Sequence, residues 1–155
     1  RDRASCLHLA CFDNHIDVIK YLLEGRVIDL NMKDTCGYTG LHYASVIEVR
    51  LDTLEILLRA GAEIDAICEY GATPFMLVCE YGDKHQLTLL LEAGSDWRLK
   101  NKYGKTGLDC ARDDNEKKVA VWKEEMKELK LNKDVINIIA KMLWSTRREV
   151  KVWAK

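Results

Sequence analysis

Proline is almost absent from this sequence, whose only proline is Pro74. No Ser/Gly-rich or low-complexity stretch interrupts the 155 residues, so nothing indicates a flexible linker between separate domains. The apolar runs are short, and charged residues break them well before the roughly 20 residues that a membrane-spanning helix needs. The sequence opens without a signal-like segment, and Arg1 is not a start methionine. We therefore expect the chain to be a piece of a longer protein.

Motifs that commonly carry chemistry are missing as well. No GxGxxG or GxxxxGK run is present to hold a phosphate, and no pair of carboxylates stands apart as an acid/base couple. Cys6, His8 and Cys11 lie close together, but no second CxxC or HxxxH group completes the four ligands of a zinc site. We predict that the chain is not an enzyme and that it uses no cofactor, metal or small-molecule substrate.

A frame that recurs along the chain is the strongest positive signal. It is clearest in residues 37–44, GYTGLHYA, where a glycine turn precedes a Thr-x-Leu-His-x-Ala helix start. The hydroxyl residue of this frame returns at Ser5, Thr39, Thr73 and Thr106, which are 34, 34 and 33 residues apart. An apolar helical pattern follows within each of the first three periods. A unit of this size cannot bury its own apolar face, so the units must stack on one another.

Residues 1–126 resemble an ankyrin-repeat domain. The resemblance is carried by the spacing, the turn glycine, and the Leu-His and Leu-Leu pairs, which recur together. The resemblance implies an all-α solenoid of stacked helix-turn-helix units joined by β-turn-like tips, with repeats at about 1–33, 34–67, 68–100 and 101–126. The last repeat is diverged, because Asp109 replaces the histidine and residues 112–118 are polar, as expected of a capping unit. Residues 127–155 carry a helix signal and are predicted to form a C-terminal helical cap or the start of a following region.

The histidines of the frame have a structural interpretation. His8 and His42 occupy positions where the family uses an imidazole to hydrogen-bond the opening hydroxyl, here Ser5 and Thr39, and nearby turn backbone. A neutral ring with one donor and one acceptor suits this role. A catalytic base would need a nucleophile beside it, and none recurs that the repeat frame does not already explain.

The six cysteines predict a location. Cys11, Cys79 and Cys110 fall on small or apolar positions of the frame, which indicates core residues in a reducing compartment. We expect an intracellular protein, cytoplasmic or nuclear. Cys36 and Cys68 fall near turn tips and are predicted to be ordinary surface cysteines.

The resemblance also implies a binding surface. In ankyrin repeats the turn tips and the exposed side of the first helix form a concave face, and the matching positions here are aromatic and acidic with a basic corner. The predicted contact residues are Phe12, Asp13, Thr35, Tyr38, Val46, Ile47, Glu69, Tyr70, Glu80, Tyr81, Lys102, Tyr103 and Lys105. Tyrosine offers a large, stiff contact area, and nearby acids favour a basic or Arg-bearing partner. We predict a protein–protein interaction module that binds a peptide or a domain through this face.

Other interpretations stay open. The chain can be the targeting arm of a larger enzyme, such as a ubiquitin ligase or a kinase, or a structural spacer. Residues 115–155 carry 11 basic and 6 acidic side chains, against 13 and 19 in residues 1–114, and the tail includes Trp144 and Trp153. Such a tail could dock on nucleic acid or an anionic membrane, but a capping helix with solvated basic residues is the simpler interpretation.

Overall fold

Helices account for all the regular structure in the computed structural model, which describes residues 4–25, 28–46 and 51–112. The helices are α1 (Cys6–Asp13), α2 (Ile16–Glu24), α3 (Gly40–Ser45), α4 (Leu51–Arg59), α5 (Pro74–Tyr81), α6 (Lys84–Glu92) and α7 (Gly107–Arg112). None of the helices in the described residues is long and apolar enough to cross a membrane. The all-α fold predicted from the sequence is confirmed.

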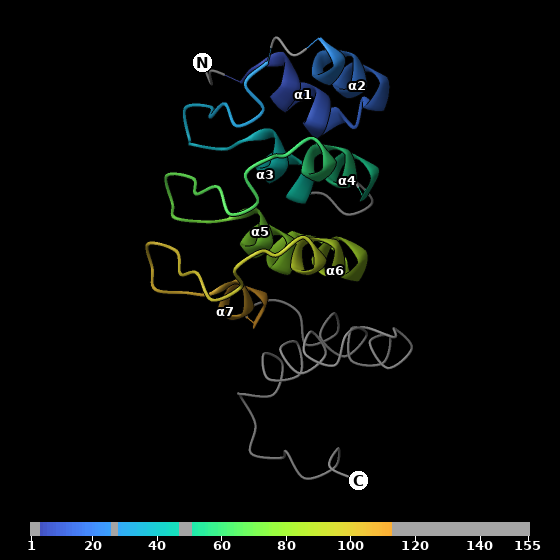
Figure 1. Cartoon of the computed structure of the whole chain (residues 1–155). Coiled ribbons are helices and arrows are strands. Elements are labelled where there is room, and N and C mark those ends of the chain that lie inside the picture. Colours follow the sequence, from blue (N-terminus) through green and yellow to red (C-terminus); the bar gives the residue numbers. More distant parts are fainter. Residues whose placement is uncertain (1–3, 26–27, 47–50, 113–155) are drawn as a thin grey trace, which may run out of the picture. The chain divides into compact units, whose positions relative to one another are not determined.

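The helices form pairs that stack in chain order (Figure 1). The first helices α1, α3 and α5 pack on one another in sequence, and the second helices α2, α4 and α6 form a second layer in the same order. We call α1–α2, α3–α4 and α5–α6 the first, second and third units. The loops that link one unit to the next project to the same side of the stack.

Capping side chains start most of the first helices, as the repeat frame predicts. Ser5 and Thr39 each form a capping box with the histidine three residues later. Thr73 instead accepts a hydrogen bond from the backbone N–H of Met76, and Pro74 occupies the first helical turn, where its missing N–H leaves no bond unmade.

The core lies between the two helix layers and between successive units. Its largest members with almost no exposure are Leu7, Ile19, Leu41, Leu54, Leu57, Phe75 and Leu90. Small residues bring the first helices close together: a Cβ on Gly40 would lie 3.2 Å from Cys11 Sγ, and one on Gly107 would lie 2.9 Å from the ring of Phe75. Cys11 and Cys79 are buried here, as the sequence predicts, and Cys110 is half-buried.

Five-residue turns form the projecting tips at residues 34–38, 68–72 and 101–105. In each tip the N–H of the first residue donates to the carbonyl of the fifth at 2.9–3.0 Å. The fourth residue is a glycine with a left-handed φ, which is 76° at Gly37, 75° at Gly71 and 72° at Gly104. These are the turn glycines that repeat in the sequence.

Successive tips are joined by backbone hydrogen bonds. The N–H of Glu69 donates to the carbonyl of Cys36 at 2.9 Å, and that of Lys102 donates to the carbonyl of Tyr70 at 3.1 Å. This close approach also corrects a prediction: Cys68 is not a surface cysteine but is only 4% exposed. Cys68 is the first residue of its tip and lies against Gly37 of the preceding tip, whose added Cβ would be 3.1 Å from Cys68 Cα.

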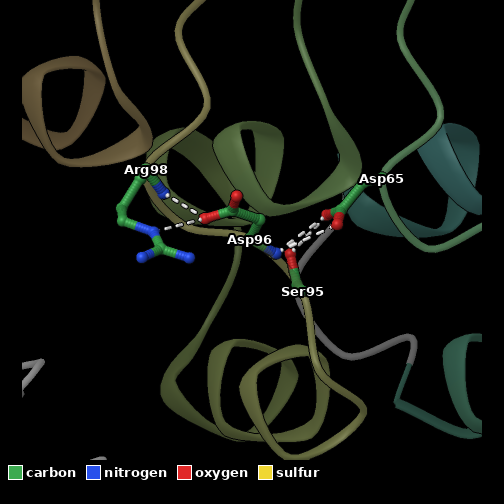
Figure 2. Close-up of polar contacts among 4 residues, drawn as sticks. All are labelled: Asp65, Ser95, Asp96 and Arg98. Carbon is green, nitrogen blue, oxygen red and sulfur yellow. Dashed lines mark hydrogen bonds and ion pairs between the residues drawn. The ribbon is translucent and has the colours of Figure 1, made fainter.

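Side chains in the interhelical loops also tie each unit to the next. Asn31 Oδ1 accepts the backbone N–H of Glu63 at 2.8 Å. At the equivalent position one unit later, the Asp65 carboxylate accepts the N–H of Asp96 at 3.0 Å and the hydroxyl of Ser95 at 2.9 Å (Figure 2). These bonds satisfy loop amides that no helix can pair.

Some predictions concern residues outside the described ranges. The predicted C-terminal helix of residues 127–155 lies there, as do most of the proposed last repeat and the predicted contact residue Ile47. The repeat boundaries given above stay predictions.

Candidate protein-binding face

The tips and the exposed parts of the first helices carry the predicted contact residues, and we call this surface the tip face. Its described members are Phe12, Asp13, Thr35, Tyr38, Val46, Glu69, Tyr70, Glu80, Tyr81, Lys102, Tyr103 and Lys105. All are exposed except Tyr38, Val46 and Glu80, which are half-buried. The exposed aromatic rings include Tyr70 at 51%, Tyr81 at 45% and Tyr103 at 73% exposure.

An aromatic cluster joins the first two units on this face. The ring of Phe12 in α1 meets that of Tyr43 in α3 edge-on, with centroids 6.1 Å apart. Tyr43 in turn lies 5.9 Å from the ring of Tyr38, which packs edge-on against His42 at 5.2 Å. The structure therefore brings together two predicted residues, Phe12 and Tyr38, through a third that the sequence prediction omitted.

Tyr43 is the missed residue. It occupies the variable position of the Thr-x-Leu-His-x-Ala frame, and this variability was the available signal, because repeat-holding residues recur and partner-facing residues differ. Its hydroxyl donates to Asp34 Oδ2 at 2.7 Å, so the ring is held at both ends.

Asp34 fixes the tip beneath this cluster. Its Oδ1 accepts the backbone N–H groups of Cys36 and Tyr38, both at 2.8 Å. Burial alone would raise the pKa of this carboxyl, but the hydrogen bonds from Tyr43 and from the two amides outweigh it and hold the pKa below its ordinary value. Asp34 is thus a fixed anion that orients Tyr38 and Tyr43.

Tyr38 stays protonated on this surface. Burial raises the pKa of its phenol, and the nearby Cys68 and Tyr70 side chains act in the same direction. The hydroxyl is therefore a neutral donor and acceptor at physiological pH. Such a group can bind a polar atom of a partner while the ring supplies apolar contact.

The third tip has a different character. Asn101 Oδ1 accepts the N–H groups of Tyr103 and Lys105 at 2.9 and 3.0 Å, much as Asp34 does in its own tip. Lys102 and Lys105 are exposed beside Tyr103. Asp13 in α1, Glu69 in the second tip and Glu80 in α5 supply acidic side chains elsewhere on the tip face.

The two histidines are structural, as predicted. The backbone N–H of Ser5 donates to His8 Nδ1 at 2.9 Å, so the ring proton lies on Nε2, which donates to the carbonyl of Met32 at 2.9 Å. His42 is held in the same way, by the N–H of Thr39 at 3.1 Å and the carbonyl of Ala72 at 3.2 Å. Both ring nitrogens are thus occupied by backbone groups, which leaves neither free to act as a base.

Burial sets the charge of His42. Loss of solvent lowers the pKa of the ring to about 4, although its hydrogen bond to the Ala72 carbonyl acts in the opposite direction. The ring is neutral at physiological pH, which matches its one-donor, one-acceptor role.

Metal ligands do not gather in the part of the chain that the structure describes. No group of three or more His, Cys, Asp or Glu side chains there is placed to hold an ion. Cys6 is exposed, whereas Cys11 and His8 are buried. Burial raises the pKa of the Cys79 thiol, so that thiol is not an activated nucleophile.

Comparison with known families agrees with this geometry. The model of the family described as "Ankyrin repeats (3 copies)" matches residues 1–68. Residues 1–68 are ankyrin repeats. Repeats of this family are generally non-catalytic modules that bind other proteins.

Similar sequences lie inside much longer proteins of several kinds. The chain is 38% identical over 91 residues to tyrosine-protein kinase HTK16 of Hydra vulgaris. This alignment covers 57% of this chain and 12% of that protein. It is 31% identical over 119 residues to palmitoyltransferase AKR1 of Debaryomyces hansenii, covering 72% and 14%. A putative ankyrin repeat protein of Rickettsia felis is 39% identical over 61 residues, covering 39% and 20%. The chain thus spans at most a fifth of these three relatives.

Proposed function

We propose that the tip face binds a basic or arginine-bearing segment of a partner protein. The observation that carries this proposal is the cluster of Phe12, Tyr43 and Tyr38, whose rings meet between two units and in which the Tyr38 hydroxyl stays protonated. Aromatic side chains that are already ordered lose little conformational freedom on binding.

Charge gives the partner its expected chemistry. Asp13 in α1, Glu69 in the second tip and Glu80 in α5 are acidic members of the tip face, while Lys102 and Lys105 belong to the third tip. An arginine can stack on a tyrosine face and pair with a carboxylate at the same time. A segment with arginine near its centre and an acidic residue near the third tip would match both regions.

A paired substitution tests the tip face. Tyr70→Ala with Tyr81→Ala removes two exposed rings, and Tyr21→Ala is the matched control because Tyr21 is 76% exposed on α2, in the other helix layer. Peptides selected from a displayed library by the wild-type protein should bind the control equally well. We expect the double variant to bind them at least about tenfold more weakly. Two aromatic anchors together commonly contribute more than about 1.4 kcal/mol to the binding free energy, which corresponds to a tenfold change in affinity. Equal affinity of all three proteins for the selected peptides would contradict the proposal.

A second role follows from the relatives and is compatible with the first. The matched segments of HTK16 and AKR1 are small parts of proteins whose names denote enzymes. We propose that this chain can serve as the targeting arm of such a longer polypeptide. The complete reading frame tests this directly, because a catalytic domain should be encoded beside the repeats, and a frame without one would contradict it. A cytoplasmic or nuclear location stays a prediction, which microscopy of the tagged full-length protein can check.

A further inference from the structure

Certain positions of each first helix face the preceding unit. In α3, a Cβ on Gly40 would lie 3.2 Å from Cys11 Sγ of the first unit. Three residues later, the ring of Tyr43 contacts Phe12, also of the first unit. The equivalent positions of the third unit, Pro74 and Leu77, are buried as well. These two positions of the frame are therefore stacking positions.

The second helices have stacking positions too. Thr53, the third residue of α4, donates its hydroxyl to Asn14 Oδ1 of the first unit at 2.7 Å. Gln86, the third residue of α6, donates its amide to the carbonyl of Ala44 in the second unit at 3.2 Å. Both side chains are 0% exposed because they lie against the unit before them.

The same positions in the first unit are apolar and exposed. Cys6 and Leu9 of α1 correspond to Gly40 and Tyr43, and Val18 of α2 corresponds to Thr53 and Gln86. Leu9 is 55% exposed and Val18 is 45% exposed, and Cys6 is also exposed. Tyr21, on the next turn of α2, is 76% exposed. We call Cys6, Leu9, Val18 and Tyr21 the leading face.

This composition does not suit the outer surface of a terminal repeat. Units that end a solenoid carry polar side chains on their outer face, because that face meets water. Leu9, Val18 and Tyr21 are apolar or aromatic instead, as at a surface that packs against another unit. The interface needed is already present within the chain, because α3 and α4 present the matching positions to α1 and α2.

We propose that the leading face is covered by a further ankyrin-type repeat of the same polypeptide, which packs on α1 and α2 as these pack on α3 and α4. The repeat frame indicates a covalent source. Ser5 is the N-cap of α1 as Thr39 is of α3 and Thr73 is of α5, and the chain enters these two later helices through a tip that follows the preceding unit. The proposal is independent of what the tip face binds.

The complete reading frame gives the first test. It should encode at least one repeat length, about 33 residues, before Arg1 with the frame's hydroxyl about that distance from Ser5. A reading frame that starts closer to Arg1 than one repeat overturns the proposal.

Stability of the extended protein gives the second test. Leu9→Gln with Val18→Gln should leave the unfolding midpoint of residues 1–155 unchanged, because both side chains are exposed there. In the natural chain extended by the upstream repeat, the same pair should lower the midpoint by at least about 4 °C. Ile67→Gln is the control, since Ile67 is 49% exposed in a loop away from this face and should behave alike in both chains.

Two results of that comparison would overturn the proposal. One is an equal effect of the pair on both chain lengths, which would show that the upstream residues do not cover the face. The other is a dimer of residues 1–155 in sedimentation velocity that the pair dissociates and that persists in the extended chain, which would make a second copy the occupant.

Discussion

His8 and His42 show how single residues hold neighbouring units in place. Each ring accepts the backbone N–H at the start of its own helix and donates to a carbonyl further along the chain. Asp109 replaces the histidine in α7 and still caps its helix, since the N–H and hydroxyl of Thr106 donate to it at 2.9 and 2.7 Å. An ionised carboxylate only accepts hydrogen bonds, so Asp109 cannot donate to a backbone carbonyl as the two histidines do.

The buried ring of His42 makes the stability of the stack depend on pH. Its pKa is about 4 in the folded chain and 6.5 when exposed, so the unfolded state alone binds the proton between these values. The contribution of His42 to the free energy of unfolding should therefore be greatest above pH 6.5. It should fall by on the order of 3 kcal/mol as the pH decreases to 4. Urea unfolding measured from pH 4 to pH 8 checks this prediction.

Glutamine at position 42 isolates the effect. His42→Gln can still accept the N-cap amide, as Gln86 does from the N–H of Asp83 at 3.1 Å, but it cannot titrate. The variant should show a flatter pH profile, whereas His85→Gln, at an exposed site on α6, should keep the wild-type slope. An unchanged slope in His42→Gln would assign the pH dependence to other groups.

The backbones of successive tips approach each other closely. A Cβ on Gly71 would lie 2.7 Å from the backbone nitrogen of Lys102, whereas one on Gly104 would meet nothing within 4 Å. Both glycines have a left-handed φ. Gly71 is therefore required both by its backbone conformation and by close packing, whereas Gly104 is required by its backbone conformation alone.

Alanine substitution distinguishes the two costs. Gly104→Ala should lower the free energy of unfolding by about 1–2 kcal/mol, the cost of a left-handed φ. Gly71→Ala should lose about 1–3 kcal/mol more, because Lys102 must move and its hydrogen bond to Tyr70 weakens. Chemical denaturation of both variants measures the difference, and equal losses would show that the tips can separate without cost.

Two loop carboxylates allow a bond between units to be compared with a bond within one loop. The Asp65 carboxylate receives the N–H of Asp96 and the hydroxyl of Ser95, which is only 6% exposed (Figure 2). The Asp96 carboxylate forms an ion pair within the same loop, in which its Oδ1 lies 2.9 Å from Arg98 Nε. Asp65→Ala should destabilise the stack by about 1–3 kcal/mol because it leaves buried donors unpaired. Asp96→Ala should lower the thermal unfolding midpoint much less. An equal decrease in both variants would contradict the claim that the Asp65 bonds stabilise the contact between units.

At the scale of the whole molecule, the sequence predicted what repeats and missed what depends on neighbours. The stack, the capping histidines and the turn glycines recur in register, so one sequence shows them. Cys68 was misplaced because its burial depends on the approach of the preceding tip. Tyr43 was missed because its contacts with Phe12 and Tyr38 cross two units and no periodicity encodes them.

The charge distribution of the stack leads to the last prediction. Glu69→Lys with Glu80→Lys reverses two acids of the tip face, and Glu24→Lys with Glu92→Lys makes the same net change at the ends of the second helices α2 and α6. Against an arginine-bearing peptide selected by the wild-type protein, the tip-face pair should slow association more than the control pair does, because local charge steers the encounter. Raising the salt concentration should shrink this difference. Equal association rates for the two pairs at low salt would place the binding surface away from the tips.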